Sequence, residues 1–405
     1  MSSLANTCPS CLQPVGNKPF YKCENIPVNS VILCHTEDQA ITLNRGDISL
    51  VYCHACGFIF NMLYDQNQCV YNQKYEETQT HSNVFNIFNH ELASHLLESY
   101  QLRNKTILEI GCGKGDFLNL ICNMGNNNGI GYDPSYVAER AVTATNNKVT
   151  IYNQFFPDNY DGPETDCIIC KMTLEHIPNV HDFLRQIHKS IATGRKPIIF
   201  FQVPNTGPIL EESRFWDIYY EHCSYFTRES LATLFQQNGF QVLDISGGYD
   251  RQYLMIEAVP MHNHFAKKVT VDPLFSVTSQ VESFVTAIQK YIPDWQNLLY
   301  AWHDQNKIVI LWGGGSKAVA FLTTLKISSE VHSVVDINPH KQNKYLPGTG
   351  HRVIEPKELI SIQPDIILAM NPVYIAEIQD HLHLLKIECE LFPLSNESMA
   401  QNLHS

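Results

Sequence analysis

The stretch Thr106–Asp133 reads TILEIGCGKGDFLNLICNMGNNNGIGYD, and it decides the fold of this chain. An apolar run leads into three glycines at alternate positions, Gly111, Gly113 and Gly115, and an amphipathic run follows them. A second apolar segment then ends in an acid, Asp133. This order predicts a strand, a tight glycine turn, a helix and a second strand. Glycines let a ligand approach the backbone closely, and the helix N-terminus beyond them offers free N–H groups.

The spacing of the turn distinguishes two classes of ligand. Dinucleotide-binding folds use G-x-G-x-x-G, whereas here an acid, Glu109, precedes glycines at every second position. This resembles motif I of the class I S-adenosylmethionine (SAM) methyltransferases. The resemblance implies that Glu109, Gly111 and Gly113 line the amino-acid end of SAM and that Asp133 binds its ribose. SAM is a cation without phosphate, so an acid at the turn favours it. The alternative is a strand–helix turn without a ligand.

Length, charge and cysteine content restrict the class of protein. A chain of 405 residues predicts more than one domain, and a net charge of −13 argues against nucleic acid as a partner. The sequence shows no apolar run of membrane-spanning length and no basic and apolar signal peptide at its start. Thirteen cysteines without a secretion signal indicate a reducing, cytoplasmic location.

Two C-x-x-C pairs lie near the N-terminus, Cys8-Pro-Ser-Cys11 and Cys53-His-Ala-Cys56. Each pair sits in a turn, and two such turns can complete a closed Cys₄ shell around a structural Zn²⁺ ion. We therefore expect a zinc-binding domain over residues 1–70. A redox pair or unpaired thiols are the alternatives, and Cys34-His35 is a competing source of a ligand.

Residues 70–82 are polar and without period, which predicts a linker; Asn86–Tyr100 has helical spacing. We expect a central domain over 71–265 with alternating strands and helices closed by a hairpin. Two cysteines in one strand, Cys167 and Cys170, face opposite sides and are predicted to be core thiols. The predicted helices are Ser135–Ala144, Asn179–Ile191 and Arg228–Gly239; the predicted strands are Val149–Tyr152, Asp166–Met172, Pro197–Val203, Gln241–Ile245 and Tyr253–Ala258.

Two places in the central domain carry polar groups suited to chemistry. Glu175 and His176 follow the carboxyl end of a strand, where open α/β sheets place their active sites. The second place is the aromatic-rich insertion Thr206–Thr227, a loop-like segment that can form a lid and that contains Glu221-His222. A histidine is a good general base near neutral pH, although a single histidine is more often structural.

The C-terminal third, 266–405, begins with a long helical segment, Phe275–Gln305, which we expect Pro293 to interrupt. A strand, the turn Gly313–Lys317 and a helix then repeat the central pattern, and a second strand ends in Asp336. The turn predicts either a phosphate-binding loop or a structural glycine turn of a Rossmann-like domain.

Together these motifs resemble the three-domain sugar C-methyltransferases, which act on nucleotide-linked 4-ketosugars, typically at C3. The resemblance covers nearly the whole chain and rests on the cysteine pairs, the central core with Leu-Glu-His-Ile, and Tyr-x-Glu-His-x-x-Tyr-Phe in the insertion. It implies that His222 is the catalytic base, with Glu221 and Tyr219 beside it, and that His176 is a second catalytic histidine. An N-terminal tyrosine that reaches the site matches Tyr75, with Tyr71 as the alternative.

The sequence therefore predicts an α/β chain with a class I methyltransferase core, a small zinc-binding domain and a C-terminal Rossmann-like domain. We assign Glu175 to the cofactor-binding set. The expected cofactors are SAM and structural Zn²⁺, and the expected partner is a nucleotide-linked sugar bound by a monomer. The alternatives are methyl transfer to an O- or N-nucleophile, a non-catalytic zinc-bearing scaffold and, on the C-terminal glycine turn, a reductase.

Overall fold

The computed structural model describes residues 7–138, 148–261 and 273–403, and the strands within these ranges form three sheets. We call residues 7–69 the N-terminal part, 83–261 the central part and 273–403 the C-terminal part. The sheet of the N-terminal part is antiparallel, in the order β1-β2-β3-β9. Its elements are β1 (Tyr21–Pro27), α1 (Glu37–Ile41), β2 (Arg45–Tyr52), β3 (Ile59–Asn61) and β9 (Ser224–Tyr225). The last of these strands comes from the insertion of the central part.

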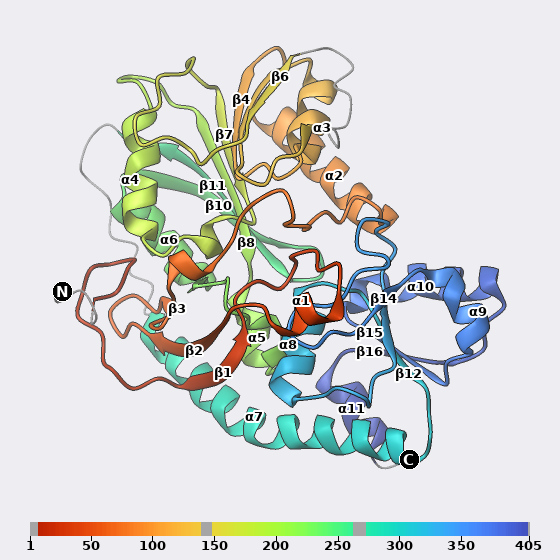
Figure 1. Ribbon diagram of the computed structural model, residues 1–405. Coiled ribbons are helices and arrows are strands. Elements are labelled where there is room, and N and C mark those ends of the chain that lie inside the picture. Colours follow the sequence, from red (N-terminus) through yellow and green to blue (C-terminus); the bar gives the residue numbers. More distant parts are fainter. Residues whose placement is uncertain (1–6, 139–147, 262–272, 404–405) are drawn as a thin grey trace.

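The central sheet has seven strands in the order β10-β11-β8-β7-β4-β5-β6. It is parallel except for β11, which pairs antiparallel with both of its neighbours and closes the predicted hairpin. Its central strands are buried because helices cover both faces, with α2 and α3 on one side and α4 and α6 on the other (Figure 1). The strands are β4 (Thr106–Ile110), β5 (Asn128–Tyr132), β6 (Val149–Tyr152), β7 (Cys167–Lys171), β8 (Ile198–Pro204), β10 (Phe240–Gly248) and β11 (Tyr253–Pro260); the helices are α2 (Asn83–Ser99), α3 (Asp116–Gly125), α4 (Val180–Ser190) and α6 (Arg228–Gln237).

Cys167 and Cys170 on β7 are fully buried, one against each helical layer, as predicted for core thiols. The predicted helix Ser135–Ala144 lies mostly outside the described residues. The insertion is more ordered than the predicted loop-like segment, because its residues form helix α5 (Thr206–Glu211), a helical turn at Phe215–Asp217 and strand β9. Phe215 and Trp216 are buried in a shared core, so packing rather than local propensity orders this segment.

The C-terminal part is a second parallel sheet, in the order β14-β13-β12-β15-β16. As in the central part, the chain begins at the middle strand and the sheet then grows to both sides, which is the doubly wound arrangement. The elements are β12 (Val309–Trp312), α8 (Ser316–Leu325), β13 (Ser333–Val335), β14 (Val353–Ile354), α9 (Leu359–Ile362), β15 (Ile366–Ala369), α10 (Ile375–Leu385), β16 (Glu390–Pro393) and α11 (Asn396–Asn402).

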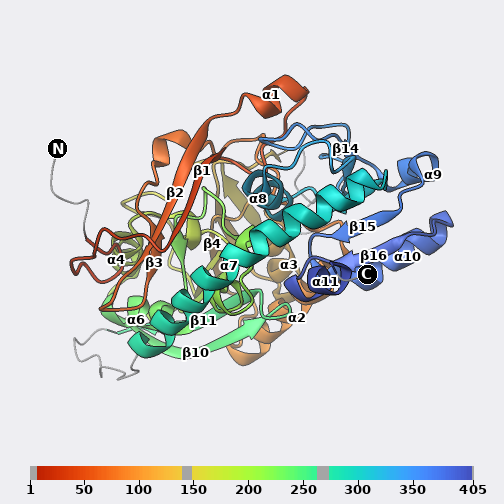
Figure 2. The ribbon, with the colours of Figure 1, turned by 90° about the horizontal axis from the view of Figure 1, so that it is seen from below.

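Helix α7 (Pro273–Asp304) crosses the molecule beneath β1, β2 and α8 (Figure 2). The predicted interruption at Pro293 is wrong, because the helix continues through this residue. Proline removes one backbone hydrogen bond, but Phe284, Trp295 and Leu299 are almost fully buried against the other parts of the chain. Tertiary packing therefore holds the helix together across the proline.

Residues 71–82 are not the exposed linker that the sequence predicts. Tyr75 is 9% exposed and Glu76 is fully buried. The amide of Asn338 donates to Glu76 at 2.9 Å, and the Ser82 hydroxyl donates to Glu377 at 2.7 Å, so this segment is fastened to the C-terminal part. It is polar because its partners are polar side chains and not because it is solvated.

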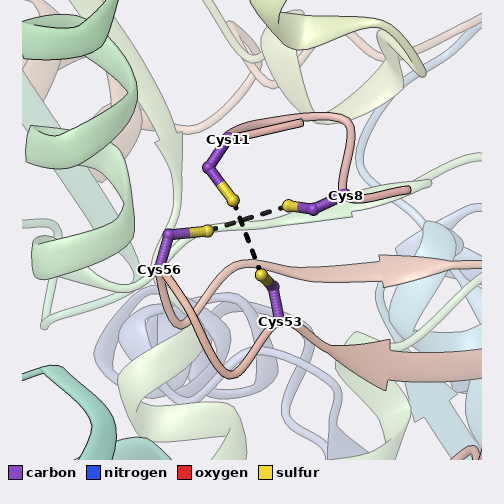
Figure 3. Close-up of side chains that lie close together, drawn as sticks. All are labelled: Cys8, Cys11, Cys53 and Cys56. Carbon is purple, nitrogen blue, oxygen red and sulfur yellow. Dashed lines mark hydrogen bonds between the residues drawn. The ribbon is translucent and has the colours of Figure 1, made fainter. Parts of the chain in front are cut away.

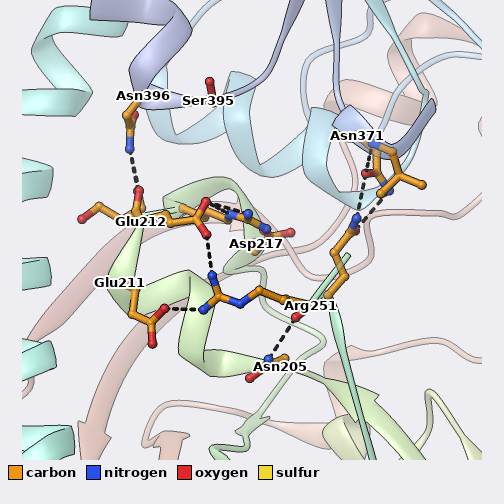
Figure 4. A network of polar contacts seen from close by, with 12 residues as sticks. Asn205, Glu211, Glu212, Asp217, Arg251, Asn371, Ser395 and Asn396 are labelled. Carbon is orange, nitrogen blue, oxygen red and sulfur yellow. Dashed lines mark hydrogen bonds and ion pairs between the residues drawn. The ribbon is translucent and has the colours of Figure 1, made fainter. Parts of the chain in front are cut away.

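Polar contacts also join the central and C-terminal parts (Figure 4). Gln252 and Asn371 exchange two amide hydrogen bonds of 2.9 and 3.1 Å, and the Asn396 amide donates to the carbonyl of Glu212 at 2.8 Å. These contacts, together with helix α7, hold the carboxyl edges of the two parallel sheets next to one cavity.

Candidate functional site

The four cysteines of the two C-x-x-C pairs come together, although 41 residues separate the pairs (Figure 3). The Sγ atoms of Cys8 and Cys56 are 3.7 Å apart, and those of Cys11 and Cys53 are 3.6 Å apart. Zinc–sulfur bonds of about 2.3 Å in a tetrahedron place sulfur atoms about 3.8 Å apart, so the four thiols fit a Zn²⁺ ion. Cys34 lies elsewhere, where its carbonyl accepts from the Tyr345 amide.

The main cavity has a volume of about 680 Å³ and lies where the three parts of the chain and residues 71–82 meet. Its walls include the glycine turn after β4, the end of β7, the insertion and the glycine turn after β12. This size suits two small substrates side by side. The structure thus brings together the segments that the sequence singles out separately.

The glycine turn after β4 depends on the absence of side chains. Gly111 and Gly113 have positive φ angles of 71° and 56°. A Cβ atom on Gly111 would lie 1.9 Å from Oγ1 of Thr173, and one on Gly113 would lie 2.6 Å from Glu77. The amide of Gly113 donates to the carboxylate of Asp133 at 2.8 Å. The turn is therefore fixed in shape and open to the cavity.

A buried acid and a half-buried lysine lie beneath this turn. Glu109 is 2% exposed, its Oε2 has no hydrogen-bond partner among the described residues, and burial raises its pKa to about 7. Lys171 donates to Asn89 at 2.7 Å and lies 3.5 Å from the ring centre of Phe117, and burial lowers its pKa to about 7. A buried carboxylate oxygen without a hydrogen-bond partner here suits a cationic ligand. The sequence did not identify Lys171 or Asn89, because neither belongs to the glycine motif.

The two predicted histidines meet in the cavity wall, with ring centres 4.8 Å apart. Nδ1 of His176 lies 3.0 Å from the carbonyl oxygen of Glu221, and since a carbonyl only accepts, this contact places the proton on Nδ1 and leaves Nε2 unprotonated. Burial lowers the pKa of His176 to about 4 and that of His222 well below its usual value. Both imidazoles are therefore neutral at neutral pH, and each has a ring nitrogen without a proton. The ring of Tyr219 lies 4.2 Å from that of His222.

Both candidate tyrosines enter this site. The hydroxyl of Tyr71 lies 3.0 Å from Nδ1 of His176, and Tyr75 faces the carboxylate of Glu221, whose ionised form it favours. Their rings pack on each other at 5.3 Å. Burial raises the pKa of each hydroxyl, so each keeps its proton and can donate it in a hydrogen bond.

Glu175 lies beside the histidines. A carboxylate oxygen of Glu175 and a ring nitrogen of each of the two histidines lie within 4.8 Å of one another. It is fully buried, and neither carboxylate oxygen has a hydrogen-bond partner among the described residues. Burial raises its pKa to about 8, because an ion without water or partners is costly. Glu175 is therefore neutral below this pH in the ligand-free protein.

Glu221 does not direct its carboxylate to His222. The carboxylate instead accepts hydrogen bonds from the side chains of Asn29, at 3.2 Å, and Ser30. These two residues belong to the N-terminal part, nearly two hundred positions away in the sequence. No sequence pattern points to these two residues, because a lone Asn-Ser pair has no distinctive spacing.

The turn after β12 repeats the geometry of the turn after β4. The amide of Gly314 donates to Asp336 at 2.9 Å, as Gly113 does to Asp133. Lys317, in the first turn of α8, forms an ion pair with Asp217 of the insertion. Two similar half-sites, one at each parallel sheet, therefore open into one cavity.

Comparison with known proteins agrees with this geometry. Residues 83–245 match the family described as a methyltransferase domain, and residues 274–388 match the family described as a C-methyltransferase C-terminal domain. A curated relative, the C-methyltransferase NovU of Streptomyces niveus, is 25% identical over 216 residues. That match covers 51% of this chain and 51% of NovU, so the chain spans about half the length of this relative.

Two solved methyltransferase structures are similar to part of the chain. The magnesium protoporphyrin IX methyltransferase ChlM of Synechocystis PCC 6803 with bound SAH is 19% identical, with a TM-score of 0.36, over 44% of this chain and 84% of that one. The 1,6-didemethyltoxoflavin-N1-methyltransferase of Burkholderia thailandensis is 19% identical, with a TM-score of 0.36, over 44% and 81%. The predicted α/β class I methyltransferase fold is confirmed by the family match and the strand order. No helix among the described residues is long and apolar enough to cross a membrane.

Proposed function

We propose that this chain uses SAM to methylate a carbon atom next to a ketone, because residues 83–245 match a methyltransferase domain and residues 274–388 match a C-methyltransferase C-terminal domain. The proposed acceptor is a nucleotide-linked 4-ketosugar, methylated at C3. The observation that carries this proposal is the shared cavity, where the first glycine turn, two neutral histidines and the second glycine turn meet.

SAM supplies an electrophilic methyl group, and the glycine turn fits this cationic cofactor. Glu109 lies beneath the turn with an unpartnered oxygen, and Asp133 lies at the end of β5, where a ribose diol would be bound. The close approach of a ligand to the backbone is possible because Gly111 and Gly113 lack side chains. We propose these four residues, together with Glu175 in the wall of the same cavity, as the cofactor-binding set.

The histidines supply the base. A hydrogen on carbon next to a ketone is acidic enough for a positioned neutral imidazole to remove. His222 is 5% exposed, and the described residues make ring contacts but no hydrogen bond to its imidazole, so a ring nitrogen is free to take this proton. The electron pair of the C–H bond becomes the enolate and then forms the new carbon–carbon bond to the methyl group. The sulfur–methyl bond breaks in the same step, its electron pair stays on sulfur, and S-adenosylhomocysteine leaves, while the proton stays on His222.

The enolate oxygen needs a hydrogen-bond donor. Tyr75 and Tyr71 keep their protons and lie beside the histidines, so either hydroxyl can stabilise the developing charge. His222 is buried, which limits the access of water that would otherwise return a proton to the enolate. The chain thus contributes alignment and charge stabilisation in addition to the base.

The second glycine turn is suited to the nucleotide. The amides of the first turn of α8, together with Lys317 and Lys341, can bind a diphosphate, and Asp336 lies where a ribose would be bound. We propose that the C-terminal part binds the nucleotide and thereby presents the sugar to His222. For the N-terminal part we propose a structural Zn²⁺ ion held by Cys8, Cys11, Cys53 and Cys56. The monomeric state and the cytoplasmic location stay predictions.

A methyl-transfer experiment tests this function. The protein is incubated with SAM carrying a ¹³C methyl group and a panel of nucleotide-linked 4-ketosugars, and the product is examined by NMR for a new methyl-bearing carbon. In D₂O with S-adenosylhomocysteine in place of SAM, the C3 hydrogen should exchange for deuterium, because the base acts without a methyl donor. Methyl transfer to oxygen or nitrogen without C3 exchange would contradict the proposal.

Replacing the base gives the matched test. His222→Ala should abolish both exchange and methyl transfer yet bind SAM as the wild type does in calorimetry. His90→Ala is the control, because His90 is exposed on α2 outside the cavity. Unchanged turnover in His222→Ala would remove this histidine from the mechanism.

A further inference from the structure

Glu221 is a junction between the histidines and the N-terminal part. Its carbonyl oxygen accepts from Nδ1 of His176, whereas its carboxylate accepts from Asn29 and Ser30 and faces Tyr75. A shift of this residue would therefore change both the orientation of the His176 ring and the direction of the Tyr75 hydroxyl. The residues that hold its carboxylate control two groups of the proposed chemistry.

Ser30 also joins this carboxylate to the C-terminal part. Its hydroxyl contacts Glu221 and lies 2.7 Å from the hydroxyl of Ser316. Ser30 is 2% exposed and Glu221 is 1% exposed, so water does not compete for these bonds. Ser316 is the first residue of α8 and faces the same cavity as the glycine turn that precedes it. One small side chain thus bridges three parts of the chain.

The number of hydrogens on this bridge limits its arrangement. A hydroxyl donates only one hydrogen, so when Glu221 is ionised, Ser30 donates to it and Ser316 donates to Ser30. When Glu221 is protonated, the chain can reverse, and Ser30 donates to Ser316. A bound anion that accepts the hydrogen of Ser316 removes it from Ser30, so the bridge responds to what occupies the second glycine turn.

We propose that Ser30 is a positioning residue that couples the second glycine turn to Glu221, and through it to His176 and Tyr75. The inference rests on the proposed function, because the anion at the turn is the diphosphate of the proposed substrate. Its consequence is that binding at the C-terminal part adjusts the hydrogen bonds of the catalytic centre. Titratable groups facing Glu221 are Cys69, Tyr71, Tyr75 and Tyr219.

Three variants test the coupling in the methyl-transfer assay: Ser30→Ala, Ser316→Ala and the double variant. With the ketosugar that the wild type methylates, each single variant should lower kcat at least fivefold, with less than a threefold change in SAM affinity. The double variant should be no slower than Ser30→Ala, because both changes break one bridge. Ser30→Thr, which keeps the hydroxyl, should restore most of the rate.

The pH profile separates positioning from a general structural defect. Removing the Ser30 donor takes away a hydrogen bond that favours ionised Glu221, so the acid limb of the kcat profile should shift to higher pH. Ser49→Ala is the control, a buried serine of β2 outside the cavity lining, and should leave the profile unchanged. Multiplicative losses in the double variant together with an unshifted profile would overturn the proposal.

A second measurement keeps the test independent of the proposed substrate. If the wild type methylates no ketosugar of the panel, the proposed function fails, and the same variants are compared by urea unfolding of the ligand-free protein. Non-additive shifts of the unfolding midpoint for Ser30→Ala and Ser316→Ala would still support the bridge. Independent shifts would overturn it.

Discussion

Substituting Gly111 by alanine is the most direct test of the glycine turn. The residue has φ of 71°, a region that side chains rarely adopt, and its Cβ atom would lie 1.9 Å from Oγ1 and 2.7 Å from Cγ2 of Thr173. The variant therefore meets two separate penalties. One is the strain of the backbone, and the other is the collision with a residue just after β7.

The size of each penalty can be separated with a control. Gly194 has φ of 87° but nothing within 4 Å of its Cβ position, so Gly194→Ala carries the backbone strain alone, about 1–2 kcal/mol. Gly111→Ala adds overpacking of about 1–3 kcal/mol. We therefore expect a total loss of unfolding free energy of about 2–5 kcal/mol for Gly111→Ala. Adding Thr173→Gly to the Gly111→Ala variant removes the colliding side chain. The double variant should therefore recover the part of the unfolding free energy lost to overpacking, but not the part lost to backbone strain.

Urea unfolding and calorimetric titration with SAM measure these effects. Gly111 and Thr173 both line the cavity, so relieving the collision displaces the wall at the proposed cofactor site. Gly111→Ala should therefore weaken SAM binding at least tenfold, whereas Gly194→Ala should bind it normally. Equal stability losses in the two variants, or unchanged SAM affinity in Gly111→Ala, would refute the assignment of this turn to the cofactor.

Three further predictions concern other parts of the site. In the ligand-free protein, burial raises the pKa of Glu175 to about 8, so the contribution of this residue to stability is complete below pH 4.5 and is lost as the pH rises through 8. Glu175→Gln should therefore be more stable than the wild type at pH 9, by on the order of 2–4 kcal/mol, but not at pH 5. Urea unfolding at the two pH values measures this difference. Cys53→Ser should lower the zinc content measured by atomic absorption and reduce methyl transfer, because β3 of the same hairpin pairs with β9; full activity in zinc-free protein would contradict this. Lys317→Met should raise KM for the nucleotide-linked sugar at least fivefold without changing SAM affinity, and an unchanged KM would exclude Lys317 from substrate binding.

The features that could be predicted from the sequence depend on residues that lie close together in the chain. The order of strands and helices in the central part follows from apolar periodicity, and the glycine turn from its spacing. The cysteine pairs were identifiable because two turns of the same spacing suit one ion, and the structure brings all four together.

The features that escaped prediction depend on contacts between distant residues. Residues 71–82 are polar, and only their partners, such as Asn338 and Glu377, show that they are buried. Pro293 predicts a break that packing on one face of α7 overrides. Asn29 and Ser30 matter only because the fold brings Glu221 to them.

The pairing of β3 with β9 has a consequence for engineering this protein. Tyr225 aligns with Ile59, three residues beyond His222, so the segment that carries the proposed base is a strand of the sheet that also bears the cysteine hairpin. A chimera with the N-terminal part of a relative would contain that relative's β3, and β9 of this chain would have to pair with it. A chimera that aims at a new acceptor should therefore exchange residues 45–61 and 206–227 together, as one cassette.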